Sequence, residues 1–85
     1  MSAAPEYRYR PTILDALLEH GLSPRPSTDP QFLRDAINEL YRFEIRKLRD
    51  RVLAGDLPRG DLAGQVVELR KRYVLLSIPI AQWTS

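Results

Sequence analysis

The sequence predicts an all-α fold, in which one short helix packs against a long antiparallel helical hairpin. Residues 30–53 form the longest stretch without an interior glycine or proline, and good helix formers fill it. Apolar residues recur at helical spacing in three stretches, and glycine and proline separate those stretches. We therefore expect a single helical domain over residues 1–85, with an N-terminal tail over 1–10 and an apolar C-terminal tail over 78–85.

The first helix is expected over residues 12–20. Thr12 is the N-cap candidate, and Gly21 supplies the left-handed position at which helices commonly end. The preceding residues 7–10 alternate tyrosine and arginine, but four residues are too few to predict a strand. Because so short a helix is unstable alone, we expect it to dock on the long helix.

The central helix is expected over residues 29–54, after a proline-rich linker. Asp29 is its N-cap candidate, and Pro30 occupies the first helical position. At 100° per residue its apolar side chains form two ridges that together cover roughly 220°. An arc this wide indicates that the helix lies between at least two neighbours. The ridges are Phe32, Ala36, Leu40 and Phe43, and Leu33, Ile37, Tyr41, Ile45, Leu48 and Val52.

The third helix is expected over residues 61–77, with Asp61 as its N-cap. Gly55 and Pro58 end the central helix, and the short turn predicts an antiparallel pair. Leu62, Val66, Leu69, Tyr73 and Leu76 step by four and three residues, which is the spacing of a packing seam. Six residues are predicted to be buried between the two long helices: Leu40, Tyr41, Leu48, Leu69, Tyr73 and Leu76.

The C-terminal tail carries Ile78, Ile80 and Trp83 after the helix-ending Pro79. A tryptophan in an apolar tail is not expected to stay in water. Two alternatives remain open at this point. Either the tail packs across the hairpin, or it docks on another chain.

No motif for catalysis, metal binding or cofactor binding occurs in the sequence. It has no cysteine and one histidine, His20, which is placed to interact with the end of the first helix. Glu44 lies near the middle of the apolar arc, where it is either buried or at the edge beside Lys47. No apolar run approaches 18 residues, so we expect a non-catalytic cytoplasmic protein without a membrane span.

The excess apolar arc predicts a self-associating interaction or assembly module. A homodimer would let the uncovered ridges of two copies pack as a four-helix bundle, and the chain would also present a surface to an unknown protein partner. In the competing outcome, Tyr7, Tyr9 and Trp83 fold over the ridges and complete a monomer. The predicted interaction surface comprises Ile45, Val52, Ala63, Val67, Val74 and Trp83.

Nucleic-acid binding is the alternative function. The sequence pI is about 9.3, but the net charge is only +2, and no helix-turn-helix pattern is present. We therefore expect weak binding at most. The candidate contacts are Arg42, Arg46, Arg49, Arg70, Lys71 and Arg72.

Overall fold

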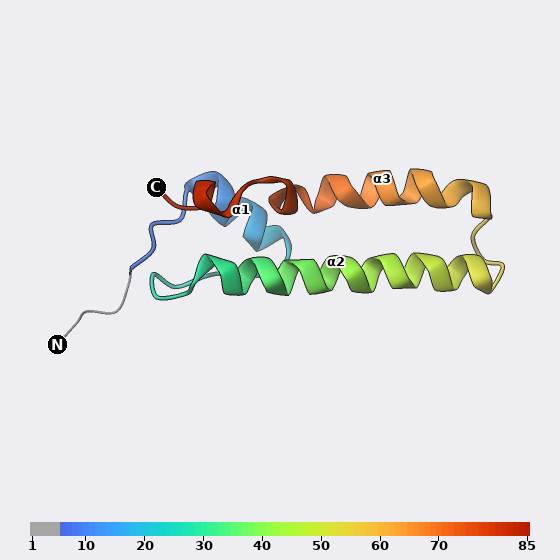
Figure 1. The fold of residues 1–85 in the computed structure, drawn as a ribbon, viewed down its shortest axis with the longest axis horizontal. Coiled ribbons are helices and arrows are strands. Elements are labelled where there is room, and N and C mark those ends of the chain that lie inside the picture. Colours follow the sequence, from blue (N-terminus) through green and yellow to red (C-terminus); the bar gives the residue numbers. More distant parts are fainter. Residues whose placement is uncertain (1–5) are drawn as a thin grey trace.

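The structure, a computed structural model, describes residues 6–85 and confirms the all-α class. The chain forms three α-helices, α1 (Pro11–Glu19), α2 (Pro30–Leu53) and α3 (Leu62–Arg72), with one short 3-10 turn before α3 and two after it, and no strand occurs in this part of the chain (Figure 1). The turns are η1 (Arg59–Asp61), η2 (Val74–Ser77) and η3 (Ile80–Gln82). Helices α2 and α3 run antiparallel and side by side, in a molecule of 58 × 22 × 18 Å.

Glycine ends both of the first two helices, as predicted. Gly21 and Gly55 have φ angles of 75° and 80°, which only glycine adopts without strain. After α1, the Leu22 N–H donates to the Leu17 carbonyl oxygen at 3.0 Å, and after α2 the Asp56 N–H donates to the Arg51 carbonyl at 2.9 Å. Both closures are Schellman motifs, which satisfy carbonyl groups that the helix itself leaves unpaired.

Of the three predicted N-caps, Asp29 is confirmed, Thr12 is wrong, and Asp61 holds the N-cap position without a side-chain hydrogen bond. Asp29 caps α2, since its Oδ1 accepts from the Gln31 N–H at 2.9 Å. Helix α1 starts at Pro11, before Thr12, because the fixed φ of proline suits the first helical position. Asp61 belongs to the η1 turn and makes no side-chain cap, because the chain already turns helically there.

Helix α3 ends earlier than predicted. It stops at Arg72, and Tyr73 leaves the helical conformation with φ −110° and ψ 40°. The chain then continues as the tighter η2 turn up to Ser77. This break rotates the following residues, so that Leu75 enters the core and Leu76 is only half-buried. A continuous helix would have turned Leu75 outward.

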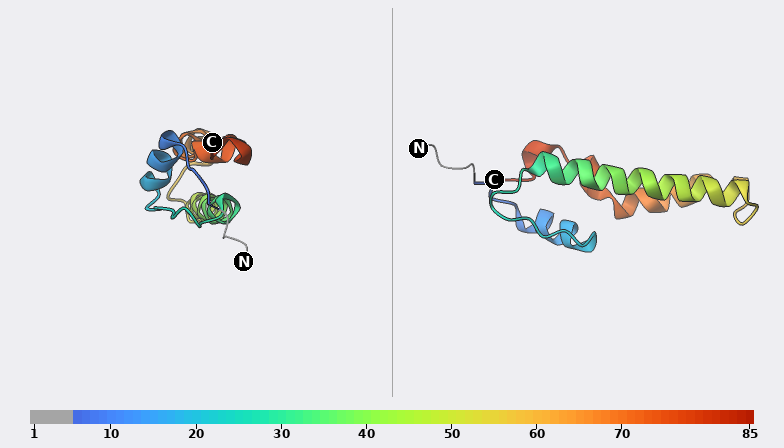
Figure 2. Two further views of the ribbon diagram at one scale, coloured as in Figure 1. Left: turned by 90° about the vertical axis from the view of Figure 1, so that its left-hand side faces the viewer. Right: turned by 90° about the horizontal axis from the view of Figure 1, so that it is seen from below.

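The buried core lies at one end of the hairpin, where α1 sits beside both α2 and the C-terminal segment (Figure 2). Of the six predicted core residues, Leu69 and Tyr73 are buried. Tyr41, Leu48 and Leu76 are half-buried, and Leu40 is 41% exposed because it lies on the other ridge of α2. The core cluster is Ile13, Leu17, Leu33, Ile37, Leu69, Tyr73, Leu75 and Trp83.

The C-terminal tail packs on its own chain, which settles the alternative left open for Trp83. Its side chain is fully buried, and its indole N–H donates to the Ile78 carbonyl oxygen at 3.1 Å. Arg34 of α2 donates to the same oxygen at 2.8 Å and to the Leu76 carbonyl at 3.1 Å. A guanidinium group thus satisfies the carbonyl groups at the end of η2, where the helical dipole favours positive charge.

The described part of the predicted N-terminal tail is held in place by hydrogen bonds. The Arg10 N–H donates to the Trp83 carbonyl at 3.0 Å, and the Ser85 N–H donates to the Arg8 carbonyl at 2.9 Å. The Tyr9 hydroxyl donates to the Thr28 carbonyl oxygen. The two tails therefore brace one another, while residues 1–5 of the predicted tail lie outside the described residues.

We predict that Leu69→Ala destabilises the protein by about 2–5 kcal/mol, because Leu69 is 1% exposed and its removal opens a cavity. The matched control is Leu53→Ala, which removes the same atoms from a side chain that is 80% exposed. The control should cost no more than about 0.5 kcal/mol. Thermal unfolding measures both changes, and equal losses would contradict the described core.

We also predict that stability falls at alkaline pH. Burial, the Asp29 carboxylate and Tyr7 raise the pKa of Tyr9 to about 12 from its ordinary value of 10.0. Because the folded state holds the proton more tightly, this stabilisation is complete below pH 10.0 and is lost towards about pH 12. Denaturant unfolding between these pH values should show a smaller loss in Tyr9→Phe than in the natural chain. Identical losses would show that the Tyr9 hydroxyl is not protected.

Candidate protein-binding surface

An apolar ridge on α2 remains uncovered. It comprises the four residues of the first predicted ridge, Phe32, Ala36, Leu40 and Phe43, and is named the apolar ridge below. Phe32 is 69% exposed and Phe43 is 55% exposed, although α1 packs on the neighbouring arc of the same helix. Lys47, one turn further on, places its amine 5.6 Å from the centre of the Phe43 ring. Water therefore reaches both phenylalanines.

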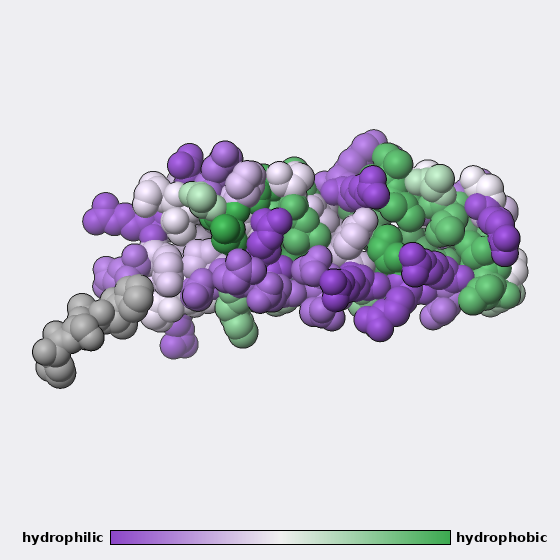
Figure 3. Space-filling model, viewed as in Figure 1, coloured by the Kyte–Doolittle hydropathy of each residue, from purple (hydrophilic) through white to green (hydrophobic). Residues whose placement is uncertain are grey.

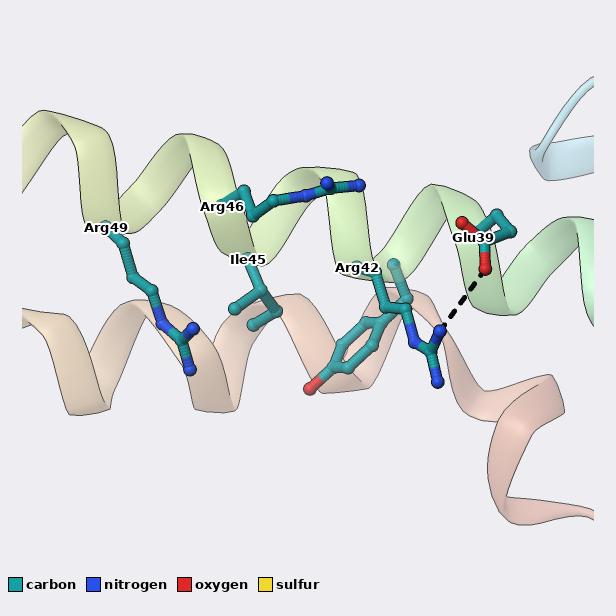
Figure 4. A pocket seen from close by; sticks show the side chains of 6 residues that line it. Glu39, Arg42, Ile45, Arg46 and Arg49 are labelled. Carbon is teal, nitrogen blue, oxygen red and sulfur yellow. Dashed lines mark hydrogen bonds and ion pairs between the residues drawn. The ribbon is translucent and has the colours of Figure 1, made fainter.

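A hollow lined by three arginines lies on a different face of α2. Arg42, Ile45, Arg49 and Val52 step by three, four and three residues, which places them on one side of the helix. The hollow has a volume of about 460 Å³, and Figure 4 shows Ile45 and Arg49 pointing from α2 towards α3. Its lining residues are Glu39, Tyr41, Arg42, Ile45, Arg46 and Arg49.

Two further hollows extend this one in both directions along the hairpin. Tyr41 also lines a hollow with Arg70, Tyr73, Leu76 and Ser77. Arg49 also lines a hollow with Val52, Leu53, Arg59 and Leu62. Neighbouring hollows share Tyr41 or Arg49, so the three follow one another along the α2–α3 pair, and together they are named the arginine trough below. Its floor is apolar and its margins carry arginines from both helices.

The face turned away from α1 carries both hydrophilic and apolar regions. Figure 2 places α1 to one side of the α2–α3 pair, and Figure 3 views the opposite side. Hydrophilic side chains cross the middle of this side, and apolar side chains gather over the part of the hairpin that α1 does not reach (Figure 3). The surface is therefore amphipathic along its length.

The predicted interaction residues are distributed over this surface with one exception. Ile45 and Val52 line the trough and are half-buried. Ala63 and Val67 are exposed and share a ridge of α3 with Arg70, which borders the trough. Val74 is exposed on η2. Trp83 is the exception, because its complete burial leaves no part of it for a partner.

The six predicted basic contacts do not form one cluster. Arg42, Arg46, Arg49 and Arg70 line the trough. Lys71 pairs with Glu68 at 3.0 Å, and Arg72 lines a separate hollow with Glu44. The sequence analysis missed Arg59, which the turn after α2 brings to the trough beside Leu62. Its position depends on the path of the turn and on how α2 and α3 align, neither of which the sequence shows directly.

The positive charge of the trough is largely uncompensated. Within residues 6–85 the ion pairs are Lys71–Glu68 and Arg42–Glu39, the latter at 3.4 Å between exposed side chains. Arg46, Arg49 and Arg70 have no acid within ion-pair distance. Glu39 is the one acid among the residues that line the three hollows.

The hollow beside α1 is lined by the histidine together with Glu19, Glu44, Arg72 and Tyr73. The His20 ring lies 4.5 Å from that of Tyr73, whose ring in turn contacts Tyr41 edge to face at 5.4 Å. Burial and the nearby Glu44 carboxylate raise the pKa of Tyr73, against the opposing effect of Arg72. Glu44 is half-buried, so neither alternative for it is realised in full. Over residues 6–85, no three acidic or histidine side chains meet in a group suited to a metal ion.

Comparison of the chain with family models, curated proteins and solved structures gave no match. None of the helices described here has both the length and the apolar character of a membrane span. The physical features of the surface therefore carry the functional argument.

Proposed function

We propose that this chain is a non-catalytic helical module that self-associates through α2 and presents a second surface to a protein partner. The exposed apolar ridge supports the proposal most directly. Two phenylalanines that are 69% and 55% exposed contribute little burial to the stability of an isolated chain. A patch of this kind on a small protein commonly marks an interaction site.

The charges beside the ridge favour a second copy as its occupant. Asp35 and Glu39 lie towards the start of α2, and Arg46 lies on the same flank towards its end. A two-fold axis close to Leu40 would place Asp35 of one copy opposite Arg46 of the other. The ridge is therefore self-complementary in an antiparallel pairing, as a two-fold interface requires.

The apolar ridge replaces the interface that the sequence analysis favoured. Ile45 and Val52 lie among arginines, so a two-fold contact there would bring like charges together. Beside the ridge, Asp35 and Arg46 carry opposite charges and would pair across the axis instead. Two hairpins joined through their α2 helices would still form a four-helix arrangement.

We predict a reversible dimer. From Phe32 to Phe43 the ridge is about 16 Å long at 1.5 Å per residue, which suits a small interface and weak association. Sedimentation should show a monomer at low concentration and a growing dimer fraction towards concentrations on the order of 100 µM. Phe43→Glu should abolish the dimer, since it buries a carboxylate in the contact. Its own helix should tolerate the change, because Lys47 lies one turn away.

The control variant is Leu53→Gln, which removes an exposed apolar side chain of α2 outside the ridge. It should dimerise like the natural chain. A charge exchange adds a sharper test, in which Asp35→Arg and Arg46→Asp each weaken the dimer and the combined variant regains it. A monomeric mass at every concentration, or a dimer unaffected by Phe43→Glu, would overturn the proposal.

A further inference from the structure

We infer that the arginine trough binds an amphipathic helical segment of a partner protein, with carboxylates along both edges of that helix. This inference rests on the proposed function and names the class of partner. It concerns a face of α2 other than the apolar ridge, and Arg46 borders both, so the two sites are separated by variants of trough arginines away from the ridge. The charge, the apolar floor and the length of the trough lead to it.

The trough concentrates cations that do not stabilise the chain. Arg42, Arg46 and Arg49 lie three or four residues apart on α2, where like charges repel. Arg59 and Arg70 add charge from the other side, and Glu39 is the only acid on the lining. A partner carrying carboxylates would relieve this repulsion and form paired hydrogen bonds with guanidinium groups.

The floor indicates that the occupant also has an apolar face. Tyr41 and Ile45 line the central hollow, and Val52 and Leu62 line the hollow at the turn end of the hairpin. Half-buried side chains at these positions gain from further burial, which a purely ionic ligand does not supply. An occupant with apolar residues inward and acids at both margins matches this division.

The dimensions match a helix. Tyr41 and Val52 mark the trough along α2, about 17 Å apart at 1.5 Å per residue. This length is about three turns, enough for apolar anchors at i, i+4 and i+7. Helix α1 provides a precedent within the molecule, since Ile13 and Leu17 already dock a short helix on the same hairpin from another side.

A second copy and a nucleic acid each fit the trough less well. Two-fold pairing of troughs would oppose arginine to arginine. Nucleic-acid binding combines cations with aromatic rings that stack on bases. Here the aromatic rings of the trough, Tyr41 and Tyr73, already contact one another. The apolar side chains of Ile45 and Val52 offer no hydrogen bond or charge to a phosphate group.

The test measures the affinity of the full chain for labelled peptides by fluorescence anisotropy. The probe is a designed helical peptide of about four turns, with leucines at i, i+4 and i+7 and glutamates on both flanks. Its matched control has lysine in place of every glutamate, and a second control keeps the composition but scrambles the leucine spacing. Single-stranded DNA and RNA of generic sequence are titrated under the same conditions.

The acidic amphipathic peptide should bind at a one-to-one ratio and more tightly than both control peptides and both nucleic acids. Arg49→Glu with Arg70→Glu should weaken its binding at least about tenfold at low salt, since both partners of each contact become anionic. Arg8→Glu with Arg25→Glu makes the same change in net charge away from the trough and should leave the affinity unchanged. Val52→Thr, which keeps the shape of the side chain, should lower the affinity for the peptide and leave nucleic-acid binding unaffected.

The inference fails if the acidic peptide does not bind, or if the scrambled peptide binds equally well. Tighter binding of DNA or RNA, lost in the variant of Arg49 and Arg70, would assign the trough to nucleic acid instead. Phe43→Glu separates this test from the proposed dimer, because it should bind the peptide normally while remaining monomeric. Unchanged melting temperatures of the exposed charge variants show that they fold.

Discussion

The difference in length between α1 and α2 determines which apolar side chains of this molecule are buried and which stay exposed. Helix α2 has 24 residues and α1 has nine, so α1 reaches only one end of it. At that end the chain builds a closed core from three helices and both tails. Beyond it α2 and α3 contact only each other. No third helix of the described chain covers the groove between them there, so the trough stays open. The ridge lies beside the closed core, on an arc of α2 that α1 leaves exposed.

The closed end depends on a few polar contacts that fix the direction of the tail. The Ile78 carbonyl accepts from both Arg34 and Trp83, which satisfies polar groups that burial would otherwise leave unpaired. The turn at Tyr73 directs the chain to this position and brings Leu75 inward. The tail therefore covers the α1 end and leaves the outer part of α3 exposed. The position at which the apolar tail packs therefore decides which surface remains available for binding.

Local chemistry made much of the fold predictable, and tertiary geometry explains the rest. Gly21, Gly55 and Asp29 mark helix ends through backbone requirements that act within a few residues. The break at Tyr73 was missed because helical spacing continues through Leu76, and only packing shows that Leu75 is buried. The arginines of α2 were identified from the sequence. That Arg59 lies beside them was not predicted, because its position depends on how the two helices align.

We conclude that stability is concentrated at the end covered by α1, while the outer half of the hairpin is held by the packing of α2 on α3 and by Leu57 in the turn, which is 6% exposed. Amide hydrogen exchange on the full chain at low concentration tests it most directly. Within α2, amides near Ile37 should exchange slowest, and those near Val52 should exchange faster through local opening, together with amides of the first turn of α3. Uniform protection along α2 would contradict this account, because it would mean that the outer half is as firmly packed as the core.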